Sequence, residues 1–159
     1  MTPIAMAQND IVDISDGAEG IEEVSSVLVQ ARTSGHRPAV LVLDIEHLPS
    51  INHLYGVTAG DRVMATVETR VSSETRSDDQ LIRLGSQRFL LVVPSVCWVD
   101  DLAFVVDRLA YTIGQPISAE GHELHVAVRF GLAVAQEDDT AIDLVHRAES
   151  KLHNHSGTG

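Results

Sequence analysis

Apolar residues recur along most of this chain, and their spacing switches between the period of a helix and the period of a strand. Apolar residues three and four positions apart predict amphipathic helices. Short apolar runs bounded by turn residues predict strands. The predicted helices cover residues 21–34, 47–55, 60–75, 101–113 and 141–153, and the predicted strands cover residues 39–43, 80–84, 90–93, 116–118 and 124–135.

The order of these segments is helix, strand, paired helices, hairpin, helix, strands and helix, which is typical of one α/β domain. Asp139-Thr140 is expected to cap the last helix. Its predicted inward face is Ile142, Val145, Ala148 and Leu152. The first 16 residues lack periodicity. We therefore expect a flexible lead-in at 1–19, one domain at 20–155 and a tail at 156–159.

Composition and charge narrow the classes of partner. The chain has 159 residues, of which 44% are hydrophobic and 21% charged, which suits a single domain with a sizeable core. The net charge of −12 repels nucleic acid backbones and anionic lipid, so we expect neither nucleic acid nor membrane as a partner. An anionic ligand would have to meet a local cluster of arginines or a helix N-terminus.

The cysteine and histidine patterns predict no metal site and no cofactor. Cys97 is the single cysteine, so an internal disulfide is impossible, and neither His47 with His53 nor His153 with His155 has metal-ligand spacing. No apolar run approaches the roughly 20 residues needed to span a bilayer. We expect a soluble, cytoplasmic protein, with Trp98 as an anchor at the edge of the core.

A turn begins at Gly85 between two strand-like runs and carries Ser86, Gln87, Arg88 and Phe89. This hairpin and several other segments, in their order and spacing, resemble the GGDEF family over residues 20–155. The segments that carry the resemblance are residues 43–52, 55–56, 59–61, 83–89 and 147–149.

The resemblance implies a palm-like α/β (α+β) fold, similar to that of class III nucleotide cyclases. Its central sheet would be mixed, mainly antiparallel, of about five strands, with flanking helices. It also implies the family's reaction, in which two GTP molecules, one on each protomer of a homodimer, condense with magnesium into cyclic di-GMP.

At the hairpin, this sequence departs from the family. Metal ions in the family are held by a strand-end aspartate, matched here by Asp44, by the next carbonyl, matched by that of Ile45, and by acids in the hairpin. Gln87 and Arg88 stand in place of the acidic pair. This exchange moves the local charge by about +3 and opposes a divalent cation. We therefore expect no catalytic residues and no bound metal, hence not an enzyme.

Further departures weaken the expected contacts with a triphosphate. Pro49 and His155 stand where the family carries lysines, and Ser86 replaces a glycine of the hairpin. Arg129 replaces a small residue near Gly131 on a late strand, and it can be buried only if it is paired.

Asn52 and Asp61 match the family's guanine-reading pair. Two other interpretations stay open: Asn52 as a solvated helix residue and Asp61 as a helix N-cap. The remnant of a nucleotide pocket would consist of Asp44, Asn52, Asp61, Gly85, Ser86, Gln87 and Arg88.

Arg76 and Asp79 reproduce the family's Arg-x-x-Asp inhibitory site at its usual distance before the hairpin. An arginine can donate to the O6 and N7 atoms of guanine, and an aspartate can accept from its N–H groups. The resemblance therefore implies a cyclic di-GMP site, with Arg108 contributing from a neighbouring helix. The alternative is a solvated ion pair between Arg76 and Asp79.

Three functional hypotheses follow. In the first, the chain is a catalytically inactive GGDEF-like domain that senses cyclic di-GMP at Arg76, Asp79 and Arg108. In the second, it is a nucleotide-independent scaffold that forms a homodimer, or a heterodimer with another GGDEF-type or signalling protein. In the third, it retains GTP binding or cyclase activity through another metal arrangement.

Overall fold

The structure is a computed structural model that describes residues 14–96 and 99–154. Its helices are α2 (Ile14–Ser34), α3 (Leu48–Tyr55), α4 (Val57–Ser73), α5 (Val99–Ile113) and α6 (Ala141–Glu149). Its strands are β1 (Ala39–Ile45), β2 (Gln80–Leu84), β3 (Arg88–Val93), β4 (Ile117–Ala119), β5 (His122–Leu124), β6 (Val128–Val134) and β7 (His153–Asn154). The predictions for Cys97, Trp98, His155, residues 1–13 and the tail at 156–159 lie outside the described residues.

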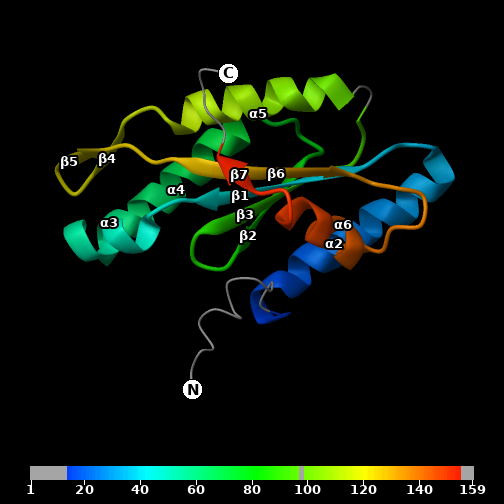
Figure 1. Cartoon of the computed structure of the whole chain (residues 1–159), viewed down its shortest axis with the longest axis horizontal. Coiled ribbons are helices and arrows are strands. Elements are labelled where there is room, and N and C mark those ends of the chain that lie inside the picture. Colours follow the sequence, from blue (N-terminus) through cyan, green and yellow to red (C-terminus); the bar gives the residue numbers. More distant parts are fainter. Residues whose placement is uncertain (1–13, 97–98, 155–159) are drawn as a thin grey trace.

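Within the described residues, the main sheet has five strands in the order β2-β3-β1-β6-β7, and β4 with β5 forms a separate two-stranded hairpin (Figure 1). All pairs in the main sheet are antiparallel. The predicted five-stranded palm-like fold is thus confirmed, without the parallel pair that a mixed sheet would need. The central strand β1 places Asp44 opposite Arg88 of β3 and opposite Arg129 of β6.

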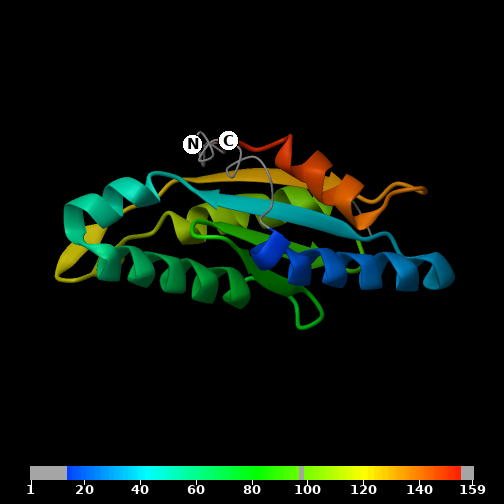
Figure 2. The ribbon, with the colours of Figure 1, turned by 90° about the horizontal axis from the view of Figure 1, so that it is seen from below.

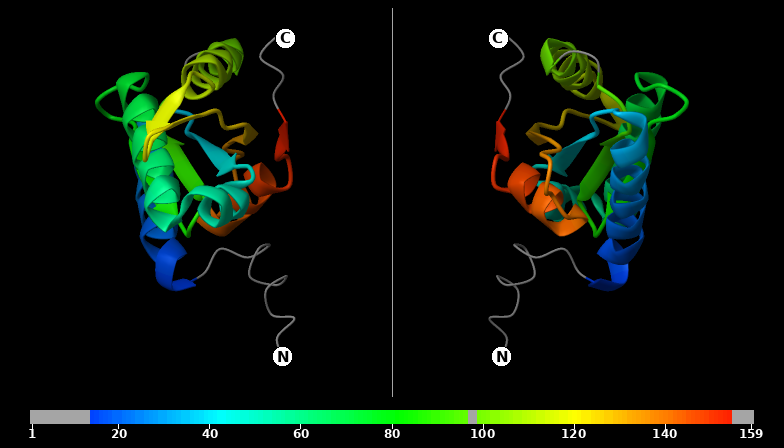
Figure 3. Two further views of the ribbon diagram at one scale, coloured as in Figure 1. Left: turned by 90° about the vertical axis from the view of Figure 1, so that its left-hand side faces the viewer. Right: turned by 90° about the vertical axis from the view of Figure 1, so that its right-hand side faces the viewer.

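Helices cover both faces of the sheet (Figures 2 and 3). Side chains of β1 alternate between the faces, as a pleated strand requires. Leu41 and Leu43 join the core beneath α4 and α5, whereas Val40 and Val42 join the core beneath α2 and α6. Every residue of β1 is buried, which explains its continuous apolar run.

Two close contacts hold the helices in place. On one face, the Arg70 guanidinium of α4 donates to the carbonyl oxygens of Ile113, Gln115 and Pro116 at 3.2, 2.7 and 2.6 Å, which joins α4 to the end of α5. On the other face, α6 crosses β6 at Gly131, where an added Cβ would collide with the Ala148 carbonyl. The glycine singled out in the sequence therefore serves close packing of a helix on the sheet.

The predicted inward face of the last helix is wrong at Ile142, which is 52% exposed. Thr140 and Asp143 form a capping box that sets where α6 begins. From that start, the buried positions are Ala141, Leu144, Val145 and Ala148, so Ile142 turns toward solvent.

Several predicted boundaries also move. The structure begins α2 at Ile14, ahead of the predicted start of the domain, and it begins α4 at Val57 instead of 60. The predicted strand over 124–135 is divided between β5 and β6. The predicted helix over 141–153 ends at Glu149, because the chain then turns to pair β7 with β6. None of the helices in the described part of the chain is long and apolar enough to cross a membrane.

A bidentate ion pair ties α6 to the loop before it. Arg147 Nη1 and Nη2 donate to the two carboxylate oxygens of Asp139 at 3.0 and 2.6 Å, and the Gln136 N–H donates to Asp139 Oδ2 at 2.7 Å. The hydrogen bonds from Arg147 hold the pKa of the Asp139 carboxyl below its ordinary value. The ionised carboxylate is therefore favoured by folding.

We expect Asp139→Asn to lower the free energy of unfolding at neutral pH by about 1–3 kcal/mol, because a charge-assisted pair is lost. The pKa of Asp139 is lowered by folding, so the wild-type advantage is present above the ordinary value of 3.8 and disappears as pH falls through the lower folded value. Urea unfolding between acidic and neutral pH measures this. Asp138→Asn, at an exposed neighbour, is the control, and a gap between wild type and Asp139→Asn that persists at the acid end would contradict the assignment.

Candidate functional site

A row of three charged side chains crosses the centre of the sheet. Asp44, whose side chain is 4% exposed, lies between Arg88 of β3 and Arg129 of β6. Arg88 Nε lies 3.4 Å from Asp44 Oδ1, and Arg129 Nη2 lies 2.5 Å from Asp44 Oδ2. Each carboxylate oxygen therefore faces a guanidinium group. The requirement that Arg129 be paired is met.

Two further carboxylates extend this row. Arg88 Nη1 lies 3.1 Å from Glu149 Oε2, and Arg129 Nε lies 3.7 Å from Glu46 Oε1. Acids and bases thus alternate from Glu149 through Arg88, Asp44 and Arg129 to Glu46. Burial of an ion requires opposite charge and hydrogen bonds close by, and this alternation supplies both to Asp44.

The turn at Gly85 brings Gln87 beside the end of β1. Gly85 has a φ of 75°, a left-handed conformation that glycine adopts without strain. The Gln87 carbonyl accepts from the Ile45 N–H at 2.8 Å. The Gln87 side-chain amide also points to the Ile45 carbonyl, with Nε2 at 3.5 Å, the outer limit of a hydrogen bond. Ser86 is exposed at the tip.

The two positions expected to read guanine, Asn52 and Asp61, differ in how exposed their polar atoms are. Asn52 Oδ1 is buried and has no hydrogen-bond partner within the described part of the chain. It packs against Gly60, where an added Cβ would collide with it. Asp61 is exposed, and it lies inside α4, which begins at Val57. The alternative of Asp61 as a helix N-cap is therefore wrong, and the solvated interpretation of Asn52 does not fit its buried oxygen.

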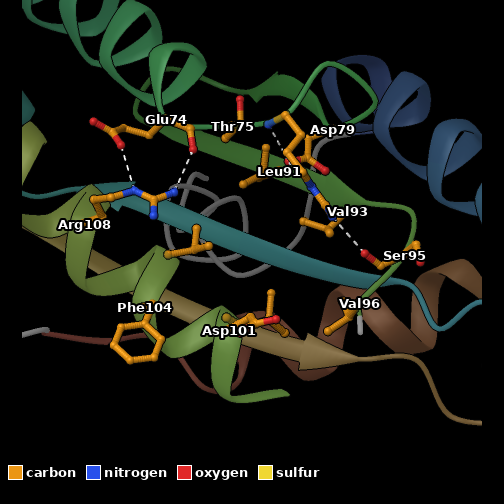
Figure 4. A pocket seen from close by; sticks show the side chains of 13 residues that line it. Glu74, Thr75, Asp79, Leu91, Val93, Ser95, Val96, Asp101, Phe104 and Arg108 are labelled. Carbon is orange, nitrogen blue, oxygen red and sulfur yellow. Dashed lines mark hydrogen bonds and ion pairs between the residues drawn. The ribbon is translucent and has the colours of Figure 1, made fainter. Parts of the chain in front are cut away.

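A second region, on the α4 and α5 face of the sheet, contains a pocket of about 430 Å³ (Figure 4). It lies between the end of α4, strand β3 and α5, and it brings Arg76 and Asp79, three residues apart, together with Arg108 of α5. Its remaining lining residues are Glu74, Thr75, Leu91, Val93, Ser95, Val96, Asp101, Leu102, Phe104 and Val105. The sequence predicted the three charged residues as one site, and the structure places them around one pocket.

Asp79 is the most unusual group in this pocket. Its side chain is 7% exposed, and Oδ2 accepts from the Arg76 backbone N–H at 2.9 Å. Oδ1 is buried without a hydrogen-bond partner among residues 14–96 and 99–154. The Arg76 side chain is 61% exposed and donates to the Ser95 carbonyl at 2.9 Å, while its Nε lies 3.9 Å from Asp79. A solvated ion pair does not describe so buried a carboxylate.

Arg108 is held by a residue that the sequence analysis did not single out. Arg108 Nε lies 2.8 Å from Glu74 Oε1, and Arg108 Nη2 donates to the Glu74 carbonyl at 3.2 Å (Figure 4). Glu74 lies two positions before Arg76, but a glutamate at the end of a helix gives no sequence signal of its partner. Phe104, one helical turn before Arg108, was also missed, although that spacing places both on one face of α5.

Comparison of the chain with known proteins identifies its family. The family model described as "Diguanylate cyclase, GGDEF domain" matches residues 21–159. The chain belongs to the GGDEF domain family. Among relatives, it is 28% identical over 140 residues to response regulator PleD of Caulobacter vibrioides, covering 86% of this chain and 31% of PleD. It is 26% identical over 139 residues to the bifunctional diguanylate cyclase/cyclic di-GMP phosphodiesterase MucR of Pseudomonas aeruginosa, covering 87% of this chain and 20% of MucR. The chain therefore spans a fifth to a third of these relatives.

Solved GGDEF domains have the same fold. The GGDEF domain of TpbB (YfiN) from P. aeruginosa superimposes with a TM-score of 0.79 at 26% identity, covering 84% of each chain. The GGDEF domain of DgcB from Caulobacter crescentus, solved in complex with c-di-GMP, gives a TM-score of 0.76 at 18% identity, covering 81% of this chain and 77% of that one.

Magnesium, which GGDEF catalysis implies, does not fit the residues around Asp44. Both carboxylate oxygens of Asp44 face guanidinium groups, and the Gln87 amide points to the Ile45 carbonyl. A divalent ion prefers oxygen ligands that are not already neutralised by cations. It would have to displace Arg88 and Arg129, whose charges repel it.

We expect Arg88→Ala to lower the free energy of unfolding by about 3 kcal/mol, because it removes one of the two guanidinium groups that face the buried Asp44. Arg129 still faces Asp44 Oδ2 in this variant, but Oδ1 has lost its guanidinium, so magnesium should raise the melting temperature of Arg88→Ala more than that of the wild type. Thermal unfolding with and without millimolar magnesium measures both effects. Arg83→Ala, at an exposed position on β2, is the matched control. An equal magnesium response in the wild type would contradict this account.

Proposed function

We propose that this domain is a catalytically inactive GGDEF module that binds cyclic di-GMP in the pocket formed by Arg76, Asp79 and Arg108. The observation that carries the proposal is Asp79 Oδ1, a buried acceptor without a partner in the described residues, on a side chain whose residue lines the pocket. A buried polar atom without a partner costs about 1–3 kcal/mol, so a ligand that donates to it is favoured.

The chemistry of a guanine base matches these groups. Guanine presents N–H donors on one edge and the O6 and N7 acceptors on another. Asp79 can accept from the first edge, while the Arg76 guanidinium donates to the second. A guanidinium has five N–H donors, so Arg76 can keep its hydrogen bond to the Ser95 carbonyl and still serve a ligand.

The ligand's phosphates would need local positive charge, because the whole chain carries −12. Arg76 and Arg108 both line the pocket and can supply that charge. The complex of DgcB with c-di-GMP supports the proposal as an analogy in fold.

The proposed lack of cyclase activity rests on the charge around Asp44. Attack of a 3′-hydroxyl on an α-phosphate needs divalent metal to offset charge on the attacking and leaving oxygens. Arg88 and Arg129 occupy the carboxylate oxygens that would bind such an ion.

A nucleotide-independent scaffold is the second candidate, favoured by two exposed aromatic side chains on one helix. Phe104 and Tyr111 of α5 are 68% and 71% exposed and lie seven residues apart, on the same side of the helix. The cyclase SiaD, a structural neighbour at 22% identity, was solved in complex with its activator SiaC. Wild-type protein that binds no nucleotide but forms a stable protein complex would select this function.

Calorimetric titration with cyclic di-GMP should show saturable binding. Arg76→Ala should weaken it at least about tenfold, since charge-assisted hydrogen bonds are lost. Asp79→Asn should also weaken it, because the amide offers one acceptor fewer. Arg83→Ala is the control, and GTP is titrated in parallel. The absence of cyclic di-GMP binding to folded wild type would reject the proposal.

Incubation with GTP and either magnesium or manganese should yield no cyclic di-GMP by chromatography, because the metal would compete with two guanidinium groups for Asp44. An active GGDEF cyclase assayed in parallel shows that the conditions permit turnover. Accumulation of product by the wild type, lost in Asp44→Asn, would establish the third hypothesis instead.

A further inference from the structure

Resting on the proposed function, we propose that Glu74 is a built-in competitor for the ligand: its carboxylate occupies Arg108 and must leave before a phosphate can bind there. Glu74 ends α4 as its C-terminal cap residue and lines the same pocket as Arg76, Asp79 and Arg108. It therefore adds a negative charge to a site that is expected to receive an anion.

The contacts of Glu74 resemble those of a bound phosphate. Its Oε1 lies 2.8 Å from Arg108 Nε, and its Oε2 accepts from the Thr112 hydroxyl at 3.2 Å. A guanidinium and a hydroxyl converging on two oxygens of one anion would also bind a phosphodiester. The carboxylate and the phosphate thus compete for the same donors. If both lay beside Arg108 at the same time, their negative charges would repel each other.

The two arginines of the pocket differ in what they already bind. Arg76 donates to a neutral carbonyl, that of Ser95, and its side chain is 61% exposed. Arg108 is paired with a carboxylate and also donates to the backbone carbonyl of Glu74 (Figure 4). Arg76 Nε lies 3.9 Å from the Asp79 carboxylate, whereas Arg108 Nε lies 2.8 Å from that of Glu74. A ligand therefore meets weaker competition from a carboxylate at Arg76 than at Arg108.

This difference predicts coupling between Glu74 and Arg108. When Glu74 is neutral, Arg108 is released to the ligand, so the loss of Arg108 costs more affinity than it does in the wild type. Removing another carboxylate from the pocket should not have this effect. Asp101 also lines the pocket and is exposed, and it supplies a control of equal charge.

The test is a titration of cyclic di-GMP into five forms of the 159-residue protein. They are the wild type, Glu74→Gln, Asp101→Asn, Arg108→Ala and the double variant Glu74→Gln/Arg108→Ala. Glu74→Gln should bind about tenfold tighter than the wild type, and Asp101→Asn less than about twofold tighter. Arg108→Ala should weaken the wild type only about two- to threefold, but it should abolish the whole gain of Glu74→Gln.

A second variant guards against a folding defect in Glu74→Gln, with melting temperatures measured for every form. Glu74→Ala removes the same carboxylate without leaving an amide beside Arg108, and it should also tighten binding about tenfold. Unchanged or weaker binding by folded Glu74→Gln and Glu74→Ala, with the wild type still binding, would overturn this inference and leave the proposed function in place. Failure of every form to bind would reject both.

Discussion

The desolvation of Asp44 is the constraint on which the centre of this domain depends. A carboxylate at the end of a fully buried strand loses its hydration, and its charge must be matched by nearby cations. In a GGDEF cyclase, metal ions can supply that match. In this chain, Arg88 and Arg129 supply it from the two neighbouring strands, at the register positions directly opposite Asp44. The same antiparallel pairing that forms the sheet thus places the countercharge.

The buried carboxylates of Asp44 and Asp79 differ in how many of their oxygens have a partner. Both oxygens of Asp44 face a guanidinium, and the outer carboxylates Glu46 and Glu149 balance the arginines in turn. For Asp79, one oxygen accepts from a backbone N–H, and the other has no hydrogen-bond partner within the described residues. A self-contained charge network leaves little for a ligand to improve, whereas an acceptor that lacks a donor leaves a specific gain. This contrast is why we propose the ligand site in the second region.

The sequence was sufficient for whatever depends on periodicity and on local spacing. Those two signals predicted the order of elements, whereas the five-stranded sheet and the grouping of Arg76, Asp79 and Arg108 were implied by the resemblance to the GGDEF family. The sequence prediction was wrong at Ile142, because the capping box of α6 determines which side of that helix faces the core. It was also wrong before Asp61, because α4 begins earlier than its apolar pattern. The pairing of Glu74 with Arg108 was also beyond reach, because it joins residues 34 positions apart through the packing of α4 against α5.

The packing of α4 against α5 also places the pocket where the two helices are joined. The pocket is bounded by the end of α4, by β3 and by α5, and Arg70 already fastens α4 to the far end of α5. At the pocket, the two helices are joined by the Glu74–Arg108 pair, a contact that is half exposed on the arginine side and therefore weaker than the buried network around Asp44. A ligand that replaced Glu74 at Arg108 would exchange a direct helix-to-helix contact for one made through itself. Under the proposed function, a ligand at the α4–α5 seam would therefore change how these two helices are held together, whereas the internally balanced network around Asp44 would stay as it is.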